Sequence, residues 1–281
     1  GGQSEAGKGV KVAIIDSGIR PENPMFSDVG FAAAEFSEEE AAYIAENPDY
    51  CRIDGGEADF CNNKLIVARA FGPTPSDVHP NEYIGSPLGY DGHGTHVAGT
   101  AVGNPIEITY QDNNVSISGV APAAQLMAYK ALWHTADGRG SGTTVALMGA
   151  LEAAIKDGAD VINNSWGGGA GGNPSSSAYS DLFTAAEEAG VVVVTAAGND
   201  GNGAQTIGCS GCIESGLTVA NTQTGRFFSQ QVEVAGETYL SIEGSNGLLT
   251  DPISLPIISA QVIAPDNFEG CEEFAEDVSF A

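Results

Sequence analysis

Apolar residues recur along this chain in two patterns: short, nearly continuous runs and runs with helical spacing. Continuous runs are typical of parallel strands buried on both faces of a sheet, and a spacing of three or four residues predicts amphipathic helices. The two kinds alternate, which predicts an α/β fold with a mostly parallel sheet. We expect strands over residues 10–15, 125–132, 160–165 and 191–196, and helices over 93–102, 145–157 and 178–189.

The ends of the second helix have their own signals. Thr144 is a suitable N-cap residue, because its hydroxyl can accept a hydrogen bond from the first turn, and Gly158 supplies a stop.

Two regions depart from the alternation of strands and helices. Residues 28–90 are acidic and loop-rich, so they are interpreted as an insertion. From residue 226 onward the pattern changes to strand-like alternation at 231–234 and to a proline-bearing run at 253–258. The predicted organisation is therefore one α/β domain over 1–225 and the start of a β-rich domain over 226–281.

The charge balance limits the partners of the chain. Its 281 residues include 10 basic and 37 acidic side chains, for a net charge of −27. Such a surface repels nucleic acid and anionic membranes, and we expect no nucleic-acid partner. No apolar run approaches the roughly 20 residues that a membrane-spanning helix needs. A solvated acidic surface and a cation-binding surface both remain open.

The cysteines indicate an oxidising compartment. Cys51 with Cys61 and Cys209 with Cys212 form two local pairs, and Cys271 is left over. The CSGC sequence could be a redox motif or half of a zinc site, but no second motif completes a zinc site. A tight structural disulfide fits its glycine-rich setting better. Disulfides predict an extracellular or cell-surface location.

Three polar residues stand where catalytic groups are expected in an α/β fold. Asp16 follows the first strand directly, His93 begins a glycine-flanked helix, and Asn199 follows the last strand. A helix start disfavours extra positive charge on a histidine, which suits a general base. Taken singly, the aspartate and the asparagine could be turn residues. His96, one turn beyond His93, is expected to be a buried, hydrogen-bonded structural histidine rather than half of a metal pair.

Four segments, VAIIDSGI, DGHGTHVAGT, VINNSWGG and VVVTAAGND, occur in this order. They resemble four successive blocks of the subtilisin-like serine proteases, over roughly residues 8–222. The resemblance implies a doubly wound, mostly parallel sheet of the subtilisin type. It also implies that Asp16 orients the imidazole, that His93 acts as general base and then general acid, and that Asn199 stabilises the oxyanion.

The resemblance further implies how a polypeptide substrate binds. The peptide would lie extended between two backbone edges, one at Gly140, Ser141 and Gly142 and the other at Ser165, Trp166 and Gly167. The pocket for the side chain before the scissile bond would be lined by Ala196, Ala197 and Gly198.

The family's nucleophile block is missing. The chain contains neither GTS nor SMA, and no serine after Asn199 opens an apolar helix. We therefore expect either an inactive fragment of a secreted serine endopeptidase, lacking the C-terminal part of its own catalytic domain, or a peptide-binding pseudoprotease. Residues 226–281 resemble the beginning of a protease-associated domain, which some relatives insert between the asparagine and the serine; this similarity favours the fragment.

The chemistry requires no cofactor, but structural calcium is an open expectation. Residues 111–114, with the sequence QDNN, fall where many relatives hold calcium, and oxygen ligands suit that ion. A polar surface loop is the equal alternative. A metal-dependent hydrolase that uses His93 and His96 is a further, weaker alternative.

Overall fold

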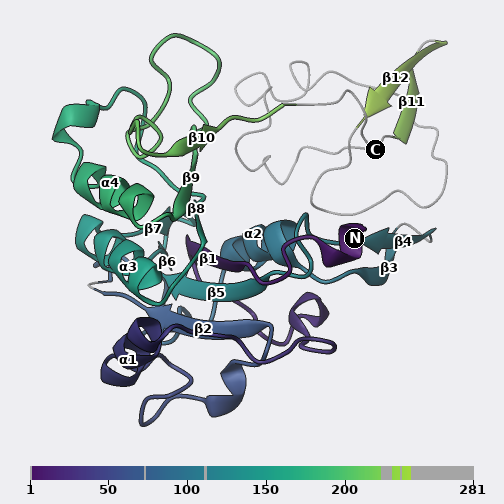
Figure 1. Cartoon of the computed structure of the whole chain (residues 1–281). Helices are drawn as coiled ribbons and strands as arrows, with labels where there is room; N and C mark the ends of the chain where they lie inside the picture. Colours follow the sequence, from purple (N-terminus) through teal and green to yellow (C-terminus); the bar gives the residue numbers. More distant parts are fainter. Residues whose placement is uncertain (1, 73, 111–112, 223–229, 235, 242–281) are drawn as a thin grey trace. The chain divides into compact units, whose positions relative to one another are not determined.

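The computed structural model describes residues 2–72, 74–110, 113–222, 230–234 and 236–241 (Figure 1). The chain divides into two compact units, residues 1–221 and 222–281, and each is described by itself.

A six-stranded sheet forms the centre of the first unit. The strand order is β10-β9-β8-β1-β5-β2, and every neighbouring pair is parallel. Strands β1, β2 and β5 consist largely of buried residues, as continuous apolar runs predict, whereas β8 and β9 alternate buried with less buried positions. The bounds are β1 Lys11–Asp16, β2 Leu65–Ala70, β5 Gln125–Lys130, β8 Val161–Asn164, β9 Val192–Ala196 and β10 Leu217–Val219.

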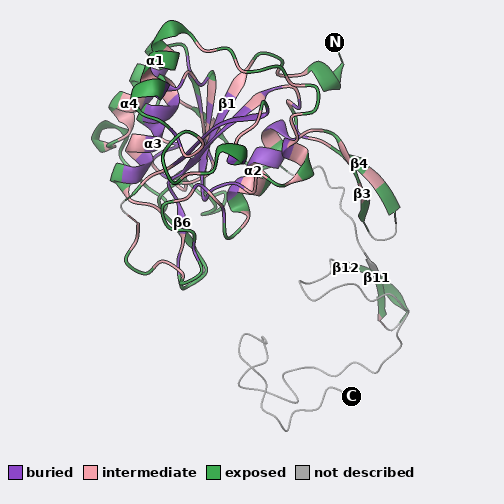
Figure 2. Cartoon of the chain, turned by 90° about the horizontal axis from the view of Figure 1, so that it is seen from below, coloured by how far each residue is buried: buried purple, intermediate pink, exposed green. Residues whose placement is uncertain are grey.

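Helices cover both faces of this sheet. On one face, Ala98 and Val102 of α2 (His93–Val102) pack with Val12 and Ile14 of β1. On the other face, α3 (Thr144–Lys156) and α4 (Ser180–Glu188) pack against a second apolar cluster, which includes Ala13 and Ile15. Figure 2 shows buried strands between partly buried helices. This arrangement confirms the predicted α/β fold with a mostly parallel, doubly wound sheet.

The position of α2 has a consequence for the chain's path. The connections β2–α2–β5 and β5–α3–β8 step in the same direction across the sheet but cross opposite faces. They therefore have opposite hands, and one of them departs from the right-handed rule for parallel strands. Among the α-helices that the structure describes, α2 is the one that contributes to the apolar cluster on this face, and its first residue, His93, lies beside the carboxyl end of β1.

The predicted strands and helices are confirmed within a few residues, with one correction at a cap. The N-cap of α3 is Thr143, not Thr144: the Thr143 hydroxyl accepts a hydrogen bond from the backbone N–H of Ala146. Thr143 has the extended backbone of a cap residue, whereas Thr144 is already helical.

The loop-rich description of residues 28–90 is wrong in part. This region contains α1 (Glu38–Glu46) and the edge strand β2 of the central sheet. A capping box between Ser37 and Glu40 starts α1. The guanidinium of Arg69 on β2 makes two hydrogen bonds to Asp157 at the end of α3, at 2.6 and 2.7 Å. That the region as a whole is an insertion stays a prediction.

Short elements complete the described residues. Two hairpins belong to the first unit: β3 (Ile106–Tyr110) with β4 (Asn113–Ile117), and β6 (Trp133–His134) with β7 (Gly140–Ser141). In the second unit, β11 (Gln230–Val234) pairs with β12 (Glu237–Ser241), so the predicted alternation at 231–234 is a strand. The run at 253–258 lies outside the described residues. Four single-turn helices are η1 Gln3–Glu5, η2 Pro24–Phe26, η3 Ala58–Phe60 and η4 Pro174–Ser176.

Both predicted cysteine pairs are disulfides. The Cα atoms of Cys51 and Cys61 lie 5.9 Å apart, and those of Cys209 and Cys212 lie 4.6 Å apart. Cys271 lies outside the described residues. No helix among the described residues is long and apolar enough to cross a membrane.

Candidate active site

Asp16 is the last residue of β1, and its side chain is only 1 % exposed. Its oxygen Oδ1 accepts a hydrogen bond of 2.7 Å from the backbone N–H of Ser17. The other oxygen, Oδ2, is buried and has no hydrogen-bond partner among the described residues. The strand end therefore presents a desolvated carboxylate beside the N-terminus of α2.

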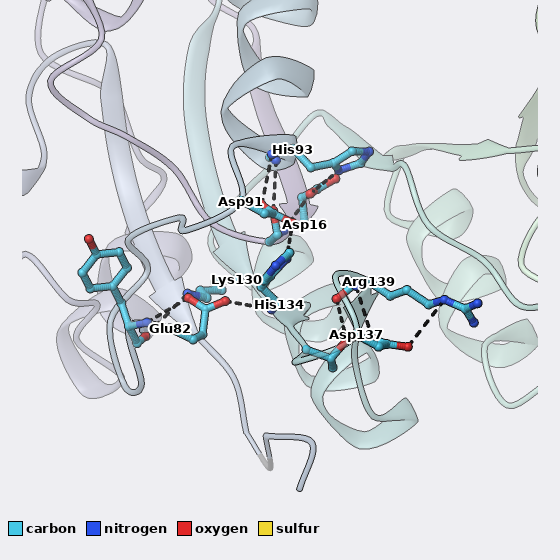
Figure 3. Close-up of polar contacts among 12 residues, drawn as sticks. Asp16, Glu82, Asp91, His93, Lys130, His134, Asp137 and Arg139 are labelled. Carbon is cyan, nitrogen blue, oxygen red and sulfur yellow. Dashed lines mark hydrogen bonds and ion pairs between the residues drawn. The ribbon is translucent and has the colours of Figure 1, made fainter. Parts of the chain in front are cut away.

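His93 is the first residue of α2, and its imidazole meets that carboxylate. Nδ1 of His93 lies 2.7 Å from Oδ1 of Asp16 (Figure 3). A carboxylate only accepts hydrogen bonds, so Nδ1 carries the proton and Nε2 is the basic nitrogen. The side chain of His93 is 52 % exposed, which leaves the ring accessible.

The glycines on either side of His93 make this contact possible. Gly92 has a φ of +82°, a backbone conformation that other residues rarely adopt. A Cβ atom at Gly94 would lie 2.2 Å from the carbonyl oxygen of Gly18, so a side chain would push α2 away from the end of β1. The glycine-flanked pattern in the sequence thus reflects close backbone approach.

Negative charge determines the protonation of the imidazole. The hydrogen bond to Asp16 raises the pKa of His93 above its ordinary value, and the charges of Asp16 and Asp91 add to this against the effect of burial. The sequence predicted that the helix start disfavours positive charge on this histidine, whereas in the structure its pKa is raised, because of its bond to Asp16 and the two nearby carboxylate charges.

Sequence reasoning missed two residues beside the pair. Ser17 donates its hydroxyl proton to Oδ1 of Asp91 at 2.6 Å, and the same oxygen accepts a bond of 3.0 Å from the backbone N–H of His93. Both residues stand inside the motifs DSG and DGHG, directly beside the predicted catalytic residues. That adjacency was the available signal.

A cavity of about 710 Å³ lies beside His93 and brings together both predicted backbone edges. The wall on one side includes β7 and Gly142, and the wall on the other begins at Ser165. Residues that the sequence did not single out also line it: Ser17, Asp91, Leu132, Gly138, Thr144, Leu147, Gly168, Gly169, Tyr179, Cys209 and Ser210. The predicted residues in the lining are His93, Gly140, Ser141, Gly142, Ser165, Trp166 and Gly167.

Ala196 is the last residue of β9, Ala197, Gly198 and Asn199 follow it, and none of these four predicted residues lines this cavity. Ala196 and Ala197 are half-buried, and Gly198 and Asn199 are exposed. The carbonyl of Ala197 accepts a hydrogen bond from the N–H of Gly208. The pocket role of Ala196, Ala197 and Gly198 and the oxyanion role of Asn199 stay predictions.

The predicted environment of His96 is wrong. This residue is exposed, because the buried face of α2 consists of Gly94, Ala98, Gly99 and Val102, and position 96 points away from it.

Among the described residues, one group has metal-ligand spacing: Asp49 with Cys51 and Cys61. Its two sulfur atoms are joined in a disulfide, so they are not available as thiolate ligands. In the expected calcium segment, residues 111–112 lie outside the described part, and Asn113 and Asn114 belong to β4. Calcium at this hairpin stays an expectation.

Three serines of the cavity have hydrogen-bond partners other than His93: Ser17, whose hydroxyl donates to Asp91, Ser165 and Ser210. Ser165 accepts a hydrogen bond from the side chain of Asn163, and Ser210 donates to the carbonyl of Trp166. Across the part of the chain that the structure describes, no serine hydroxyl hydrogen-bonds to the imidazole of His93.

The structure thus places a buried aspartate in contact with an accessible histidine at the carboxyl edge of a parallel α/β sheet, where folds of this class collect their functional groups. The model of the subtilase family matches residues 7–273. The chain therefore belongs to the subtilase family.

Curated relatives agree with this assignment. The chain is 33 % identical over 171 residues to "Subtilisin-like protease SBT2.1" of Arabidopsis thaliana, which covers 59 % of this chain and 19 % of that protein. It is 32 % identical over 223 residues to "Subtilisin-like protease SBT4.13" of the same plant, covering 79 % of this chain and 26 % of that protein. The chain thus spans about a fifth to a quarter of the length of these relatives.

Proposed function

We propose that this chain forms the Asp–His part of a secreted serine endopeptidase and that the serine nucleophile lies outside residues 1–281. The observation that carries the proposal is the 2.7 Å contact between Nδ1 of His93 and Oδ1 of Asp16. This contact orients the ring and leaves Nε2 free to take a proton.

The proposed chemistry is acyl transfer. Nε2 of His93 takes the proton of a serine hydroxyl as its oxygen attacks the carbonyl carbon of the scissile peptide bond. The protonated imidazole, stabilised by Asp16, then gives that proton to the leaving amine as the carbon–nitrogen bond breaks. Water hydrolyses the resulting ester by the same route, with His93 again as base. Asn199 is proposed to donate a hydrogen bond to the oxyanion.

The proposed substrate is a polypeptide in extended conformation. Gly140, Ser141 and Gly142 on one wall of the cavity, and Ser165, Trp166 and Gly167 on the other, offer backbone groups to such a chain. The net charge of −27 disfavours nucleic acid as a partner.

An uncovered face of the sheet supports a contribution from further polypeptide. Val192 on β9 and Leu217 and Val219 on β10 are 49 %, 58 % and 50 % exposed. Their registers place all three on the same face as α2. Apolar sheet faces are normally covered by a second layer, so we propose that the missing C-terminal part of the catalytic domain packs here.

Two disulfides within the described residues support secretion or a cell-surface location, because such bonds persist in oxidising compartments. Structural calcium stays part of the proposal, with no site assigned among the described residues.

The test incubates the purified chain with an unstructured protein and follows cleavage. We expect no cleavage by residues 1–281, because the hydroxyl that His93 would deprotonate is absent. Cleavage that disappears in His93→Ala would overturn this expectation. A non-catalytic peptide-binding role is the alternative outcome, indicated if the full gene product also cleaves nothing but retains peptides.

A further inference from the structure

We infer that Asp91 and Ser17 are positioning residues that hold the backbone of His93 in a closed ring of hydrogen bonds, and so keep its imidazole on Asp16. The inference rests on the proposed role of His93 as general base. It assigns a function to two residues that take no part in the proton transfers of the proposed chemistry.

The ring has four bonds, two on each carboxylate. Oδ1 of Asp16 accepts from Nδ1 of His93 and from the N–H of Ser17, both at 2.7 Å. Oδ1 of Asp91 accepts from the N–H of His93 at 3.0 Å and from the hydroxyl of Ser17 at 2.6 Å. The path therefore closes: Asp16, the ring and backbone of His93, Asp91, Ser17 and back to Asp16.

The hydroxyl of Ser17 has no freedom within this ring. It donates its one proton to Asp91 and accepts a 3.1 Å bond from the backbone N–H of Gly94. Ser17 thus ties the end of β1 to the first turn of α2 twice, once through Asp91 and once directly. Ser17 is 2 % exposed, so water cannot easily replace these bonds.

His93 needs such an anchor because its side chain is 52 % exposed. Packing alone does not fix an imidazole with half of its surface in solvent. Because Asp91 holds the backbone N–H of His93, only the side-chain torsions of His93 remain to be fixed before the imidazole contacts Asp16. Preorganisation of this kind lowers the cost of reaching the reactive geometry.

The loop that carries Asp91 is itself anchored to the sheet. Glu82 accepts a 2.7 Å bond at Oε1 from Nζ of Lys130 and another at Oε2 from the N–H of His134 (Figure 3). Lys130 also donates to the carbonyl of Leu88 at 2.7 Å, and it is the register partner of Asp16 on β5. Lys130 therefore holds the loop through Glu82 and Leu88, and it pairs in the sheet with Asp16 at the end of β1.

The charged groups around the ring are few among the described residues. Asp16 and Asp91 face His93, and Oδ2 of Asp91 lies 3.8 Å from Nδ1 of His134. Lys130 and Glu82 form a fully buried ion pair behind His134. Asp91 is thus the one carboxylate other than Asp16 that acts on His93 directly, by its bond to the backbone and by its charge.

The experiment compares Asp91→Asn, Asp91→Ala and Ser17→Ala with the unchanged chain by NMR of the histidine side chains. Two quantities are measured: the exchange rate with water of the His93 Nδ1 proton and the pKa of His93. Asp137→Asn is the matched control, because it removes one acidic charge and contacts Thr135 and Arg139 rather than the ring.

In Asp91→Ala and Ser17→Ala we expect the Nδ1 proton to exchange about tenfold faster or more, the effect of losing one hydrogen bond to a charged group. The pKa of His93 should fall in Asp91→Ala. In Asp91→Asn the amide oxygen can still accept both bonds, so exchange should stay within about twofold of the unchanged chain while the pKa falls through loss of charge.

An exchange rate in Asp91→Ala equal to that in Asp137→Asn would overturn the inference. An Nδ1 exchange rate that rises equally in Asp91→Asn and Asp91→Ala would also overturn the inference. The lost charge of Asp91, and not its hydrogen bonds, would then explain the faster exchange. If Asp91→Ala does not fold, the Nδ1 exchange rates of Asp91→Asn and Ser17→Ala are compared instead. The inference then requires faster exchange in Ser17→Ala than in Asp91→Asn. None of these measurements involves peptide cleavage. The positioning role of Asp91 and Ser17 can therefore be disproved while the proposed function stands, and the proposed function can be disproved while the positioning role stands.

Discussion

Among single residues, Asp16 is in the least balanced environment. One oxygen receives two hydrogen bonds, while the other is buried with no partner among the described residues. A buried carboxylate is costly unless it is paired. A protonated imidazole on His93 provides the compensating charge, which is the state that the proposed chemistry needs after proton transfer.

Asp16→Asn should therefore lower the pKa of His93, measured by NMR titration, with the signals of exposed His96 as internal reference. The raised pKa of His93 contributes stability that is present below about pH 6.5 and lost as pH rises through the folded pKa. The difference in unfolding free energy between the unchanged chain and the variant should thus shrink with rising pH. An unchanged pKa of His93 in the variant would contradict this account.

The pKa of Lys64 is lowered, whereas that of His93 is raised. The side chain of Lys64 is fully buried, donates to the carbonyls of Pro122 and Ala124 at 2.7 and 2.6 Å, and has its pKa lowered by burial to about 8. Between about pH 8 and the ordinary lysine value of 10.5, the unfolded chain binds the proton that the folded chain has released. Stability contributed by this residue therefore rises with pH across that range.

Lys64→Met should remove this rise, which is about 3 kcal/mol in total for a pKa lowered from 10.5 to about 8. Denaturant unfolding at a series of pH values measures it, with Lys8→Met as the control, since Lys8 is exposed and pairs only with Glu5. A pH dependence above 8 that is identical in Lys64→Met and Lys8→Met would show that Lys64 does not release its proton on folding.

Much of the site could be predicted from single residues, because the residues with catalytic chemistry stand inside recognisable sequence motifs. The aspartate after a buried strand and the histidine between glycines were identified from sequence, and the structure brings them together. The roles of Asp91 and Ser17 could not be predicted, because a closed ring of hydrogen bonds depends on two loops meeting in space. The exposure of His96 was misjudged because the buried face of α2 was not worked out.

Among the secondary-structure elements, the edge strand β2 is joined to helix α3 by a buried side-chain pair. Arg69 of β2 and Asp157 at the end of α3 form a bidentate ion pair, and Asp157 also accepts a 2.8 Å bond from the hydroxyl of Tyr129 on β5. Arg69 is 8 % exposed and Asp157 is fully buried. The pair joins the edge strand to the helix that covers it.

Asp157→Asn should destabilise the fold by about 3–5 kcal/mol, because it leaves the buried guanidinium without a counter-charge. Glu152→Gln, which breaks the exposed pair with Lys156 on the same helix, should leave the free energy of unfolding nearly unchanged. Urea unfolding of both variants measures the contrast. Equal, small losses would mean that Arg69 does not depend on Asp157.

The same pair explains why β2 was not predicted. Its apolar run, Leu65–Ala68, is short, is followed by an arginine and stands inside an acidic region. An arginine after so short a run favours a surface loop unless its buried partner, 88 residues away, is known. Helices α2, α3 and α4 and strands β1, β5, β8 and β9 were predicted because their apolar pattern is a local property, whereas α1 and the short edge strand β10 were not.

For the whole molecule, the large negative net charge affects the stability of the folded state. An excess of 27 acidic charges opposes the compact state through self-repulsion. Raising the sodium chloride concentration from about 0.01 M to about 0.15 M shortens the Debye length from about 30 to about 8 Å and should raise the thermal unfolding midpoint. Circular dichroism melting curves check this, with an uncharged osmolyte of equal osmolarity as control. A midpoint that falls with salt would mean that specific ion pairs outweigh the repulsion.

We propose that residues 1–281 supply the base and its carboxylate and that the hydroxyl comes from elsewhere in the protein. Covalent labelling with a fluorophosphonate probe, which marks serines activated by a base, distinguishes the two contributions. The full gene product should be labelled at a serine outside residues 1–281, His93→Ala should abolish that labelling, and residues 1–281 alone should remain unlabelled. Labelling of a serine within residues 1–281, or labelling that survives His93→Ala, would contradict the account.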